Sequence, residues 1–519
     1  ERLIGDKIKQ IDWTEGNQPR DYKSEPTNRT KEINIITNKR LLPFEYQKEI
    51  IQKINEYFRE NDNGRLYLPC GTGKTFIGFW TFQNLLRYNS VCILVPSLYL
   101  LSDTYEFWKD QLQYYEKEFH FIAIGSDMEI KEQGFRPTTN KDEILNELKQ
   151  SNNVIVITTY QSSDLLLDSC KELKFKFDLS IFDEAHRSTG KADRQFTHLL
   201  SDEYNISKKR LFMTATERIF DYSNIEDEET ILSMDNEDIY GKVIYIMSLR
   251  QAIEDGALVN YNIIAPFIST DKYQNLIINN KFIKDSNDEE IYDSKIISLA
   301  FMILHTMTTY KYTHLLIFSY LNENAEKIIN VIKKLSPQFF KEDDDVYYKY
   351  LSSDHTMKTR KLEVEKFKKA KKGIISSARI FNEGVDIKIC DAVCFADNKE
   401  SSKDIIQCVG RCLRKYENKP DKIASVIIPF FCEIQEKFFD NSNKSYKKIR
   451  LILKSLASTD DMVSDRFSLV NCNGERTIGS KVRIVDSNPN SLGRGSSSNE
   501  LENNIAKKID IKELQNNII

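Results

Sequence analysis

The 519-residue sequence has no run of about 18 apolar residues, the length that a membrane-spanning helix needs. Its first residues also have no apolar core of the kind found in signal peptides. We therefore expect an intracellular protein without a membrane span. The chain begins with Glu1 rather than Met, which indicates that it is cut from a longer polypeptide.

A strong charge of one sign is also missing. The 74 Lys and Arg residues nearly balance the 78 Asp and Glu residues, for a net charge of -4. Such a balance excludes a global electrostatic attraction to nucleic acid, so any binding of this kind must be local.

Metal-binding cysteine patterns are absent as well. The closest pairs among the nine cysteines, Cys390 with Cys394 and Cys408 with Cys412, are four residues apart and have no histidine nearby. This spacing favours buried thiols over a metal site, and reduced cysteines suit a cytosolic compartment.

Short apolar runs typical of buried strands recur through two parts of the chain, with helical stretches between them. In the first part they cover residues 91–95, 154–157, 179–182 and 210–213, and in the second part 315–318, 373–375, 392–395 and 425–428. Strands that alternate with helices predict an α/β fold, in which parallel sheets are flanked by helices.

A chain of this length is too long for one core. We predict an N-terminal extension (1–38), a first α/β domain (39–225), a linker (226–262), a second α/β domain (263–432), a helical segment (433–470) and a flexible C-terminal tail (471–519). The tail is expected because residues 487–499 are nearly all Ser, Asn, Gly and Pro, although an ordered loop is the alternative.

A glycine loop follows the short apolar run 66–68. Its sequence, Leu-Pro-Cys-Gly-Thr-Gly-Lys-Thr at 68–75, leads into a predicted helix that begins near Lys74. Gly71, Thr72 and Gly73 would leave backbone N–H groups free to contact phosphate oxygens, at the positive end of the helix dipole. Lys74 would reach the β- and γ-phosphates, and the Thr75 hydroxyl would bind magnesium. A glycine turn before an ordinary helix is the alternative, because Leu68 stands where a strict phosphate loop has Gly.

Two carboxylates follow the apolar run that ends at Phe182. Asp183 and Glu184 would lie at the carboxyl end of a buried parallel strand, where open α/β sheets bind ligands. Asp183 is therefore the candidate that holds Mg²⁺, directly or through a ligand of the ion, and Glu184 is the candidate base that orients the attacking water. A solvated turn is the alternative. With the glycine loop, the pair predicts a site that hydrolyses ATP.

Three further motifs complete an ordered series: Thr214-Ala215-Thr216, the segment 382–386 around Gly384, and Gln-Cys-Val-Gly-Arg-Cys-Leu-Arg at 407–414. In this order and spacing the chain resembles the superfamily 2 helicases and translocases over about residues 40–430. The segment 183–190, the Pro-x-x-x-Gln pattern at 43–47 and the segment 401–414 look most like the motors of restriction enzymes and of large DNA viruses.

The resemblance implies two tandem RecA-like domains and assigns a role to each matching residue. Gln47 would read adenine, although a Gln at a helix entry is the alternative. His186 and Thr214, Ala215 and Thr216 would couple hydrolysis to domain movement. The remaining matches to the nucleotide and catalytic motifs are Gly384, Asp386, Gln407, Arg411 and Arg414. If their segment is a helix, Arg411 and Arg414 share one face and would act on the γ-phosphate.

Several residues at strand ends match the positions at which the family contacts nucleic acid. They are Pro96, Ser97, Thr158, Thr159, Tyr160, Phe318, Ser319, Ser376 and Ser377. Hydroxyls and backbone N–H groups there suit phosphate contacts that do not read sequence, although ordinary strand-end residues look the same. Departures from the family pattern are Glu217, where Pro is frequent, and Asp103, where Gln is frequent.

We therefore expect an ATP- and Mg²⁺-dependent DNA helicase or translocase, in a bacterial cell or a cytoplasmic viral compartment. An RNA helicase, a duplex translocase of a restriction-type complex and a nucleotide-gated scaffold without turnover are the alternatives. A nuclease, a methyltransferase or a replication or transcription protein would be the partner, docked on residues 436–519.

Overall fold

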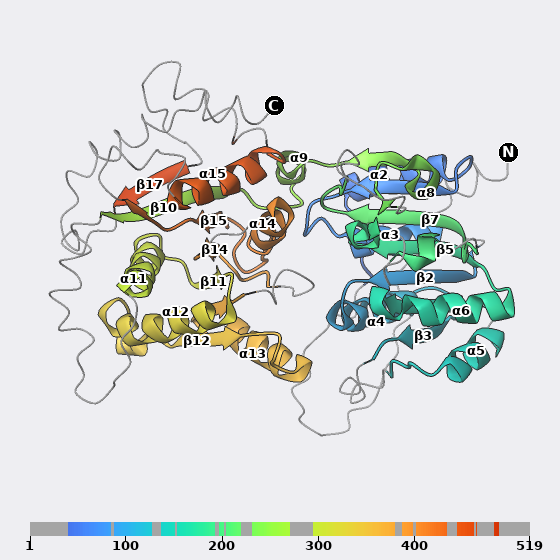
Figure 1. Cartoon of the computed structure of the whole chain (residues 1–519), viewed down its shortest axis with the longest axis horizontal. Coiled ribbons are helices and arrows are strands. Elements are labelled where there is room, and N and C mark those ends of the chain that lie inside the picture. Colours follow the sequence, from blue (N-terminus) through green and yellow to red (C-terminus); the bar gives the residue numbers. More distant parts are fainter. Residues whose placement is uncertain are drawn as a thin grey trace, which may run out of the picture. The chain divides into compact units, whose positions relative to one another are not determined.

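The computed structural model describes residues 40–84, 88–126, 136–150, 153–191, 197–201, 204–219, 231–269, 294–378, 387–397, 401–432, 444–460, 463 and 482–486. The chain divides into two compact units between Ile246 and Met247, and residues 68–72 group with the second unit. Each unit is built on its own sheet (Figure 1).

The first unit contains a seven-stranded parallel sheet with the order β3-β4-β2-β5-β7-β1-β9. Its strands are β1 (Asn63–Tyr67), β2 (Ser90–Val95), β3 (His120–Ile124), β4 (Val154–Thr159), β5 (Phe177–Asp183), β7 (Ser207–Thr214) and β9 (Lys242–Ile246). A short antiparallel pair, β6 (Gly190–Lys191) with β8 (Ile231–Leu232), lies outside the sheet.

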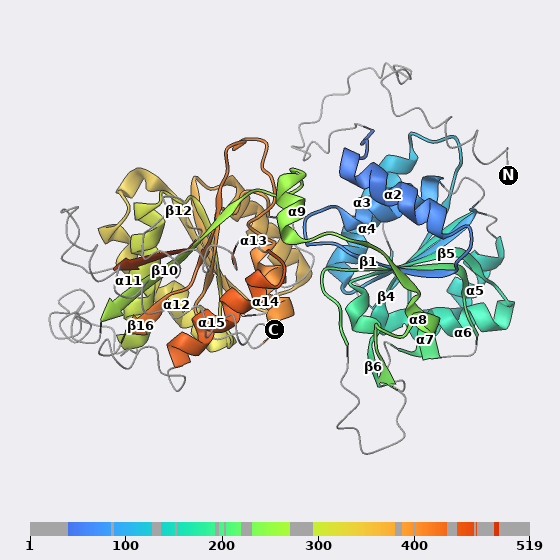
Figure 2. The same ribbon diagram turned by 90° about the horizontal axis from the view of Figure 1, so that it is seen from above.

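Helices cover both faces of this sheet (Figure 2). On one face lie α2 (Glu45–Tyr57), α3 (Lys74–Asn84) and α4 (Leu98–Leu112). On the other lie α6 (Ser163–Leu173), α7 (His198–Ser201) and α8 (Glu237–Tyr240), with α5 (Lys141–Gln150) packed against α6. Two short 3-10 helices, η2 (Tyr160–Ser162) and η3 (Ala185–Ser188), follow β4 and β5.

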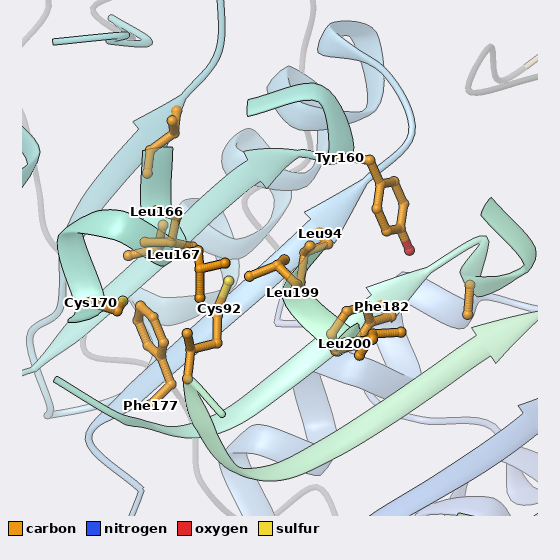
Figure 3. Packing of buried hydrophobic residues seen from close by; sticks show 14 of the residues in the cluster. Cys92, Leu94, Tyr160, Leu166, Leu167, Cys170, Phe177, Phe182, Leu199 and Leu200 are labelled. Atoms are coloured by element: carbon orange, nitrogen blue, oxygen red, sulfur yellow. The ribbon is translucent and has the colours of Figure 1, made fainter. Parts of the chain in front are cut away.

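The strands of this sheet are apolar because helices cover both of its faces. Every residue of β2 and β4 is buried. Cys92 and Leu94 of β2 pack with Phe177 and Phe182 of β5 in one cluster (Figure 3). This rigid core fixes the strand ends, which carry the candidate site.

The second unit contains an eight-stranded sheet with the order β12-β13-β11-β14-β15-β10-β16, and β17 pairs with β10. All of these pairs are parallel. The strands are β10 (Tyr261–Ser269), β11 (His314–Phe318), β12 (Val346–Leu351), β13 (Lys372–Ser377), β14 (Ala392–Phe395), β15 (Ala424–Ile427), β16 (Phe430–Cys432) and β17 (Val482–Asp486). Its main helices are α9 (Leu249–Glu254), α11 (Ser294–Thr309), α12 (Asn322–Leu335), α13 (Met357–Lys369), α14 (Ser402–Val409) and α15 (Lys444–Ala457). The predicted fold class, two parallel α/β domains, is confirmed.

The linker that we predicted over 226–262 differs from the structure. Among its described residues, Lys242–Ile246 form the edge strand β9 of the first sheet, in register with β1. Residues from Met247 onward belong to the second unit, in which β10 already begins at Tyr261. The mixed polar and apolar composition of this segment does not reveal that it completes both sheets.

The flexible tail that we predicted over 471–519 is wrong for residues 482–486, because β17 pairs with β10 from Ile263 to Phe267. The helical segment also belongs to the second unit. Its helix α15 packs against α14, and the Lys448 ammonium in α15 donates to the carbonyls of Ala396 and Pro429 at 3.0 and 3.2 Å.

Two expectations about the rest of the chain can be compared with the described residues. Cys390, Cys394, Cys408 and Cys412 are buried free thiols, as the sequence predicts. Within those residues, no helix has the length and apolar character that crossing a membrane requires.

Candidate active site

The carboxyl ends of the parallel strands β1, β2, β4, β5 and β7 lie along one edge of the first sheet. The glycine loop follows β1, and the Asp183-Glu184 pair ends β5. Thr214 is the last residue of β7. Motifs that are far apart in the sequence therefore meet at the edge where open α/β sheets bind ligands.

The glycine loop has the backbone conformation that its residues permit. Gly71 and Gly73 have φ angles of +94° and +80°, a region that glycine enters without steric cost. The Thr72 hydroxyl donates to the Pro69 carbonyl at 2.8 Å and closes the loop on itself. Helix α3 begins at Lys74, so the first backbone N–H groups of the helix lie at the end of the loop.

Gln47 lies beside this loop. It is 2% exposed, and its Oε1 accepts the backbone N–H of Phe44 at 2.9 Å, which caps α2. A Cβ added at Gly73 would lie 2.7 Å from the Gln47 Nε2, so a side chain at position 73 would collide with the glutamine amide. The adenine-reading role of Gln47 stays a prediction.

Lys74 and the two carboxylates form the charged centre of the site. The Lys74 ammonium lies 3.1 Å from Oε1 of Glu184, and both side chains are largely buried. Burial, followed by the charge of Glu184, raises the pKa of Asp183 to about 6, while Lys74 acts in the opposite direction. The single lysine therefore faces two negative groups in a poorly hydrated place.

Glu184 leaves the strand in an unusual conformation. Its φ and ψ angles are both 50°, in the left-handed region that a residue with a Cβ rarely adopts. The backbone N–H of Glu184 donates to Oδ1 of Asp183 at 3.0 Å. Such strain persists where the surrounding structure enforces it, and this occurs most often at functional sites.

His186 connects Glu184 to the end of β7. Its Nδ1 lies 3.5 Å from Oε2 of Glu184 and 2.9 Å from the Thr214 hydroxyl. That hydroxyl donates to the Thr216 carbonyl at 3.1 Å, across Ala215. A continuous line of polar contacts thus joins the candidate base to the segment 214–216.

The candidate nucleic-acid residues of the first unit lie at strand ends, but most of their side chains are not on the surface. Ser97 caps α4 by accepting the Leu100 N–H, and Pro96 precedes it. Thr158, Thr159 and Tyr160 are at most 4% exposed. These exposures include the backbone, so contact of the three residues with nucleic acid stays a prediction, and the phenol of Tyr160 donates to the Asp183 carbonyl at 2.8 Å.

The second unit carries the other candidates at the carboxyl ends of β11 and β13. Phe318, Ser319, Ser376 and Ser377 are at most 1% exposed, and the Ser319 N–H donates to the Ser377 carbonyl at 3.0 Å. Gly384 and Asp386 lie outside the described residues.

Arg411 and Arg414 lie beyond the helix, so the condition for a shared helical face is not met. Helix α14 contains the buried Gln407 but ends at Val409, and the chain then turns. Arg411 is buried, whereas Arg414 is half-buried and forms an antiparallel bridge with Leu258. The Lys422 ammonium also donates to the Arg414 carbonyl at 2.9 Å.

Several residues that support the site have no local sequence signal. Tyr240, fully buried, donates to the Ser188 carbonyl at 2.8 Å. Arg65, 4% exposed, donates to the Met234 carbonyl and to the Tyr67 hydroxyl, which in turn donates to Glu217. Glu217, the departure from the family pattern, therefore ties the segment 214–216 to β1. Of the residues in this hydrogen-bond network, only Glu217 had a feature in the sequence from which the network could have been predicted.

Comparison with known proteins assigns the chain to a family. Residues 40–219 match the family described as type III restriction enzyme, res subunit, and residues 296–416 match the helicase conserved C-terminal domain. The chain belongs to the superfamily 2 helicases and translocases. As in that superfamily, each of the two matches lies on one of the two parallel sheets.

Individual relatives of this helicase-family chain include viral and restriction proteins. It is 29% identical over 422 residues to probable helicase A859L of African swine fever virus (isolate Tick/South Africa/Pretoriuskop Pr4/1996), an alignment covering 80% of this chain and 44% of the viral protein. It is 26% identical over 273 residues to the type I restriction enzyme EcoAI endonuclease subunit of Escherichia coli, covering 49% of this chain and 31% of that subunit. The chain thus spans less than half the length of these relatives.

A solved structure has the same fold. The ATP-dependent type ISP restriction-modification enzyme LlaBIII bound to DNA matches with a TM-score of 0.71 and 24% identity, covering 98% of this chain and 34% of that one.

Proposed function

We propose that this chain is an ATP-dependent motor that moves along DNA and acts as a helicase or translocase. The contact that carries the proposal is the Lys74–Glu184 ion pair beside Asp183, at the carboxyl edge of the first sheet. A family member that had lost hydrolysis would not need a buried lysine, a base and a metal-binding carboxylate together. This argues against the nucleotide-gated scaffold.

Lys74 and Glu184 form an ion pair with each other in the structure. This pairing suggests the order of steps in ATP hydrolysis. The γ-phosphate of ATP attracts Lys74 away from Glu184, and Glu184 is then available to orient water. The water oxygen attacks the γ-phosphorus as the bond to the β–γ bridging oxygen breaks. ADP leaves with the electron pair, and Glu184 receives the proton of the water. The contact between Lys74 and Glu184 would therefore depend on which nucleotide is bound.

A divalent cation fits the donors at this site, since Asp183 offers an acidic oxygen at the strand end and Thr75 lies in the first turn of the adjoining helix. The family uses such an ion with ATP, and we propose Mg²⁺, held by Asp183 and the Thr75 hydroxyl. When bound, it would neutralise phosphate charge during transfer.

His186 and the segment 214–216 would transmit the change at Glu184. Because His186 contacts both Glu184 and Thr214, a shift of the carboxylate alters its contact with the end of β7. We propose that Gln407, Arg411 and Arg414 of the second unit take part in hydrolysis, as the family resemblance implies. ATP turnover then becomes domain movement.

DNA is the proposed track because the relatives include restriction enzymes and the LlaBIII structure is bound to DNA. The strand ends at 96–97, 158–160, 318–319 and 376–377 would hold its phosphates, mostly through backbone N–H groups. We further propose that a nuclease, a methyltransferase or a replication or transcription protein works with this motor. The site of action is a bacterial cell or a cytoplasmic viral compartment. An RNA helicase and a duplex translocase that does not unwind remain the alternatives.

Steady-state ATP hydrolysis tests this proposal. We expect DNA to raise the rate by about tenfold or more over the rate without polynucleotide, and Lys74→Ala to abolish both rates. Single-stranded DNA, duplex DNA and single-stranded RNA are compared at equal nucleotide concentration. Stimulation by duplex DNA without strand separation would identify a translocase, and stimulation by RNA alone would identify an RNA helicase. Absence of turnover with every polymer would contradict the motor.

A further inference from the structure

We propose that Tyr160 is a positioning residue through which the nucleic-acid-binding end of β4 controls the orientation of Asp183 and Glu184. This inference rests on the proposed function and adds a route by which DNA would stimulate hydrolysis. It replaces the direct contact with nucleic acid that the sequence suggested for this tyrosine.

The side chain of Tyr160 points into the core of the first unit. Tyr160 is the first residue after β4, and the residue is only 2% exposed. Its ring belongs to the core cluster that also contains Leu94 and Phe182 (Figure 3). The phenol donates to the Asp183 carbonyl at 2.8 Å. A phosphate at the surface therefore cannot reach the phenol, but it can reach the exposed Gln161, which follows Tyr160 in η2.

The Asp183 carbonyl, which accepts this hydrogen bond, lies next to the strained backbone of Glu184. Asp183 is the last residue of β5, and the next residue, Glu184, is in the left-handed conformation. The Asp183 carbonyl belongs to the peptide unit that links these two residues. A change at this carbonyl rotates that peptide unit and with it the direction of the Glu184 carboxylate.

The start of η2 is stiff enough to transmit a displacement. The Thr159 hydroxyl donates to the Ser162 hydroxyl at 3.2 Å, and the Ser163 hydroxyl donates to the Tyr160 carbonyl at 2.8 Å. These contacts tie the strand end to the turn that follows it. A phosphate that pulls on this backbone therefore moves the ring, rather than an isolated loop.

A second tyrosine provides a matched control. Tyr240 in α8 donates to the Ser188 carbonyl at 2.8 Å, at the other end of the segment 183–188. Both phenols are buried and both hold a carbonyl of the same segment. Only Tyr160, however, directly follows a strand end that we propose to contact DNA.

The experiment compares wild type, Tyr160→Phe and Tyr240→Phe of the full chain. Each substitution removes one hydroxyl and keeps the ring. We measure ATP turnover against DNA concentration, the turnover without DNA, and the melting temperature. We expect Tyr160→Phe to lower the ratio of DNA-saturated to DNA-free turnover by about fivefold or more, with the half-saturating DNA concentration within about twofold of wild type. Tyr240→Phe should keep the wild-type ratio.

Each other outcome overturns the inference in a distinguishable way. An unchanged ratio with a higher half-saturating DNA concentration would make Tyr160 a DNA contact. Equal losses with and without DNA, accompanied by a lower melting temperature, would make it a structural residue only. An equal drop in the ratio for both variants would show that stimulation by DNA needs only a rigid segment 183–188, with no special role for Tyr160. If DNA does not stimulate ATP turnover of the wild type, the proposed function is wrong, and the role of Tyr160 that rests on it is wrong as well.

Discussion

At the scale of single residues, the site combines backbone strain with crowded charge. A left-handed glutamate costs about 1–3 kcal/mol, and the contacts around it must offset this cost. Asp183 adds a buried carboxyl next to Glu184, and the charge of Lys74 opposes that of Glu184 there. Both features oppose folding, so the site is expected to lower stability in exchange for activity.

Asp183→Asn should therefore stabilise the protein at neutral pH while abolishing hydrolysis. The pKa of Asp183 is raised from 3.8 to about 6, so the folded chain holds this proton more tightly than the unfolded chain. Ionisation on raising the pH through this window costs stability, roughly 1–3 kcal/mol in total. The gain from Asn should be full at pH 7 and should vanish below about pH 4. Thermal melting at both pH values checks this, and a variant less stable than wild type at pH 7 would contradict it.

Some site residues could be predicted from the sequence and others could not. The two groups differ in the kind of contact that they make. Lys74, Asp183, Glu184 and His186 stand in short motifs, because phosphate and water impose a fixed local chemistry. Tyr240 is more than 50 residues from the carbonyl that it holds, and any buried hydroxyl donor would serve. Contacts of this kind have no spacing rule, so only the fold reveals them.

At the scale of elements, interior strands were the most predictable and edge strands the least. The buried runs of β2, β4 and β5 are continuous because both faces are covered. Edge strands such as β9 and β12 contain partly exposed residues, and their pattern resembles that of loops. The sequence also left open whether the segment 407–414 is a helix, because the apolar spacing continues past the last helical residue, Val409.

Strand β17 gives a prediction for truncated chains. Ending the chain after residue 475 removes β17 and uncovers one side of β10, whereas ending it after residue 490 keeps the pairing. We expect the shorter chain to melt at least about 4 °C below the longer one and to aggregate more readily. Melting and light scattering of both chains check this. Equal behaviour would show that the pairing contributes little, and partner-docking deletions within 436–519 would then be safe to interpret.

At the scale of the whole molecule, the candidate catalytic residues are divided between the two compact units. Lys74 and Glu184 belong to the first unit, and Arg411 and Arg414 belong to the second. The tandem arrangement was predictable from the order of the motifs. The exact division was not, because composition shows no break at residue 246.

Arg414→Ala should therefore lower ATP turnover by about 100-fold or more while ATP affinity changes by less than about threefold. The reason is that the proposed role of Arg414 is to stabilise charge that develops during hydrolysis, rather than to bind the nucleotide in its ground state. Lys415→Ala, at the neighbouring exposed cation, is the control. Binding of a fluorescent ATP analogue and steady-state turnover check this. A large loss of affinity with retained turnover would assign Arg414 to nucleotide binding.

The position of β10 has a consequence for biosynthesis. This strand is made early in the second unit, yet its partners β15 and β17 follow much later in the chain. At roughly 5–20 residues per second, a ribosome needs on the order of ten seconds or more to deliver both neighbours. During that interval both edges of β10 lack their final partners, which is a risk for association between nascent chains. The first unit carries the same risk at β1, because its neighbours β7 and β9 also follow much later in the chain.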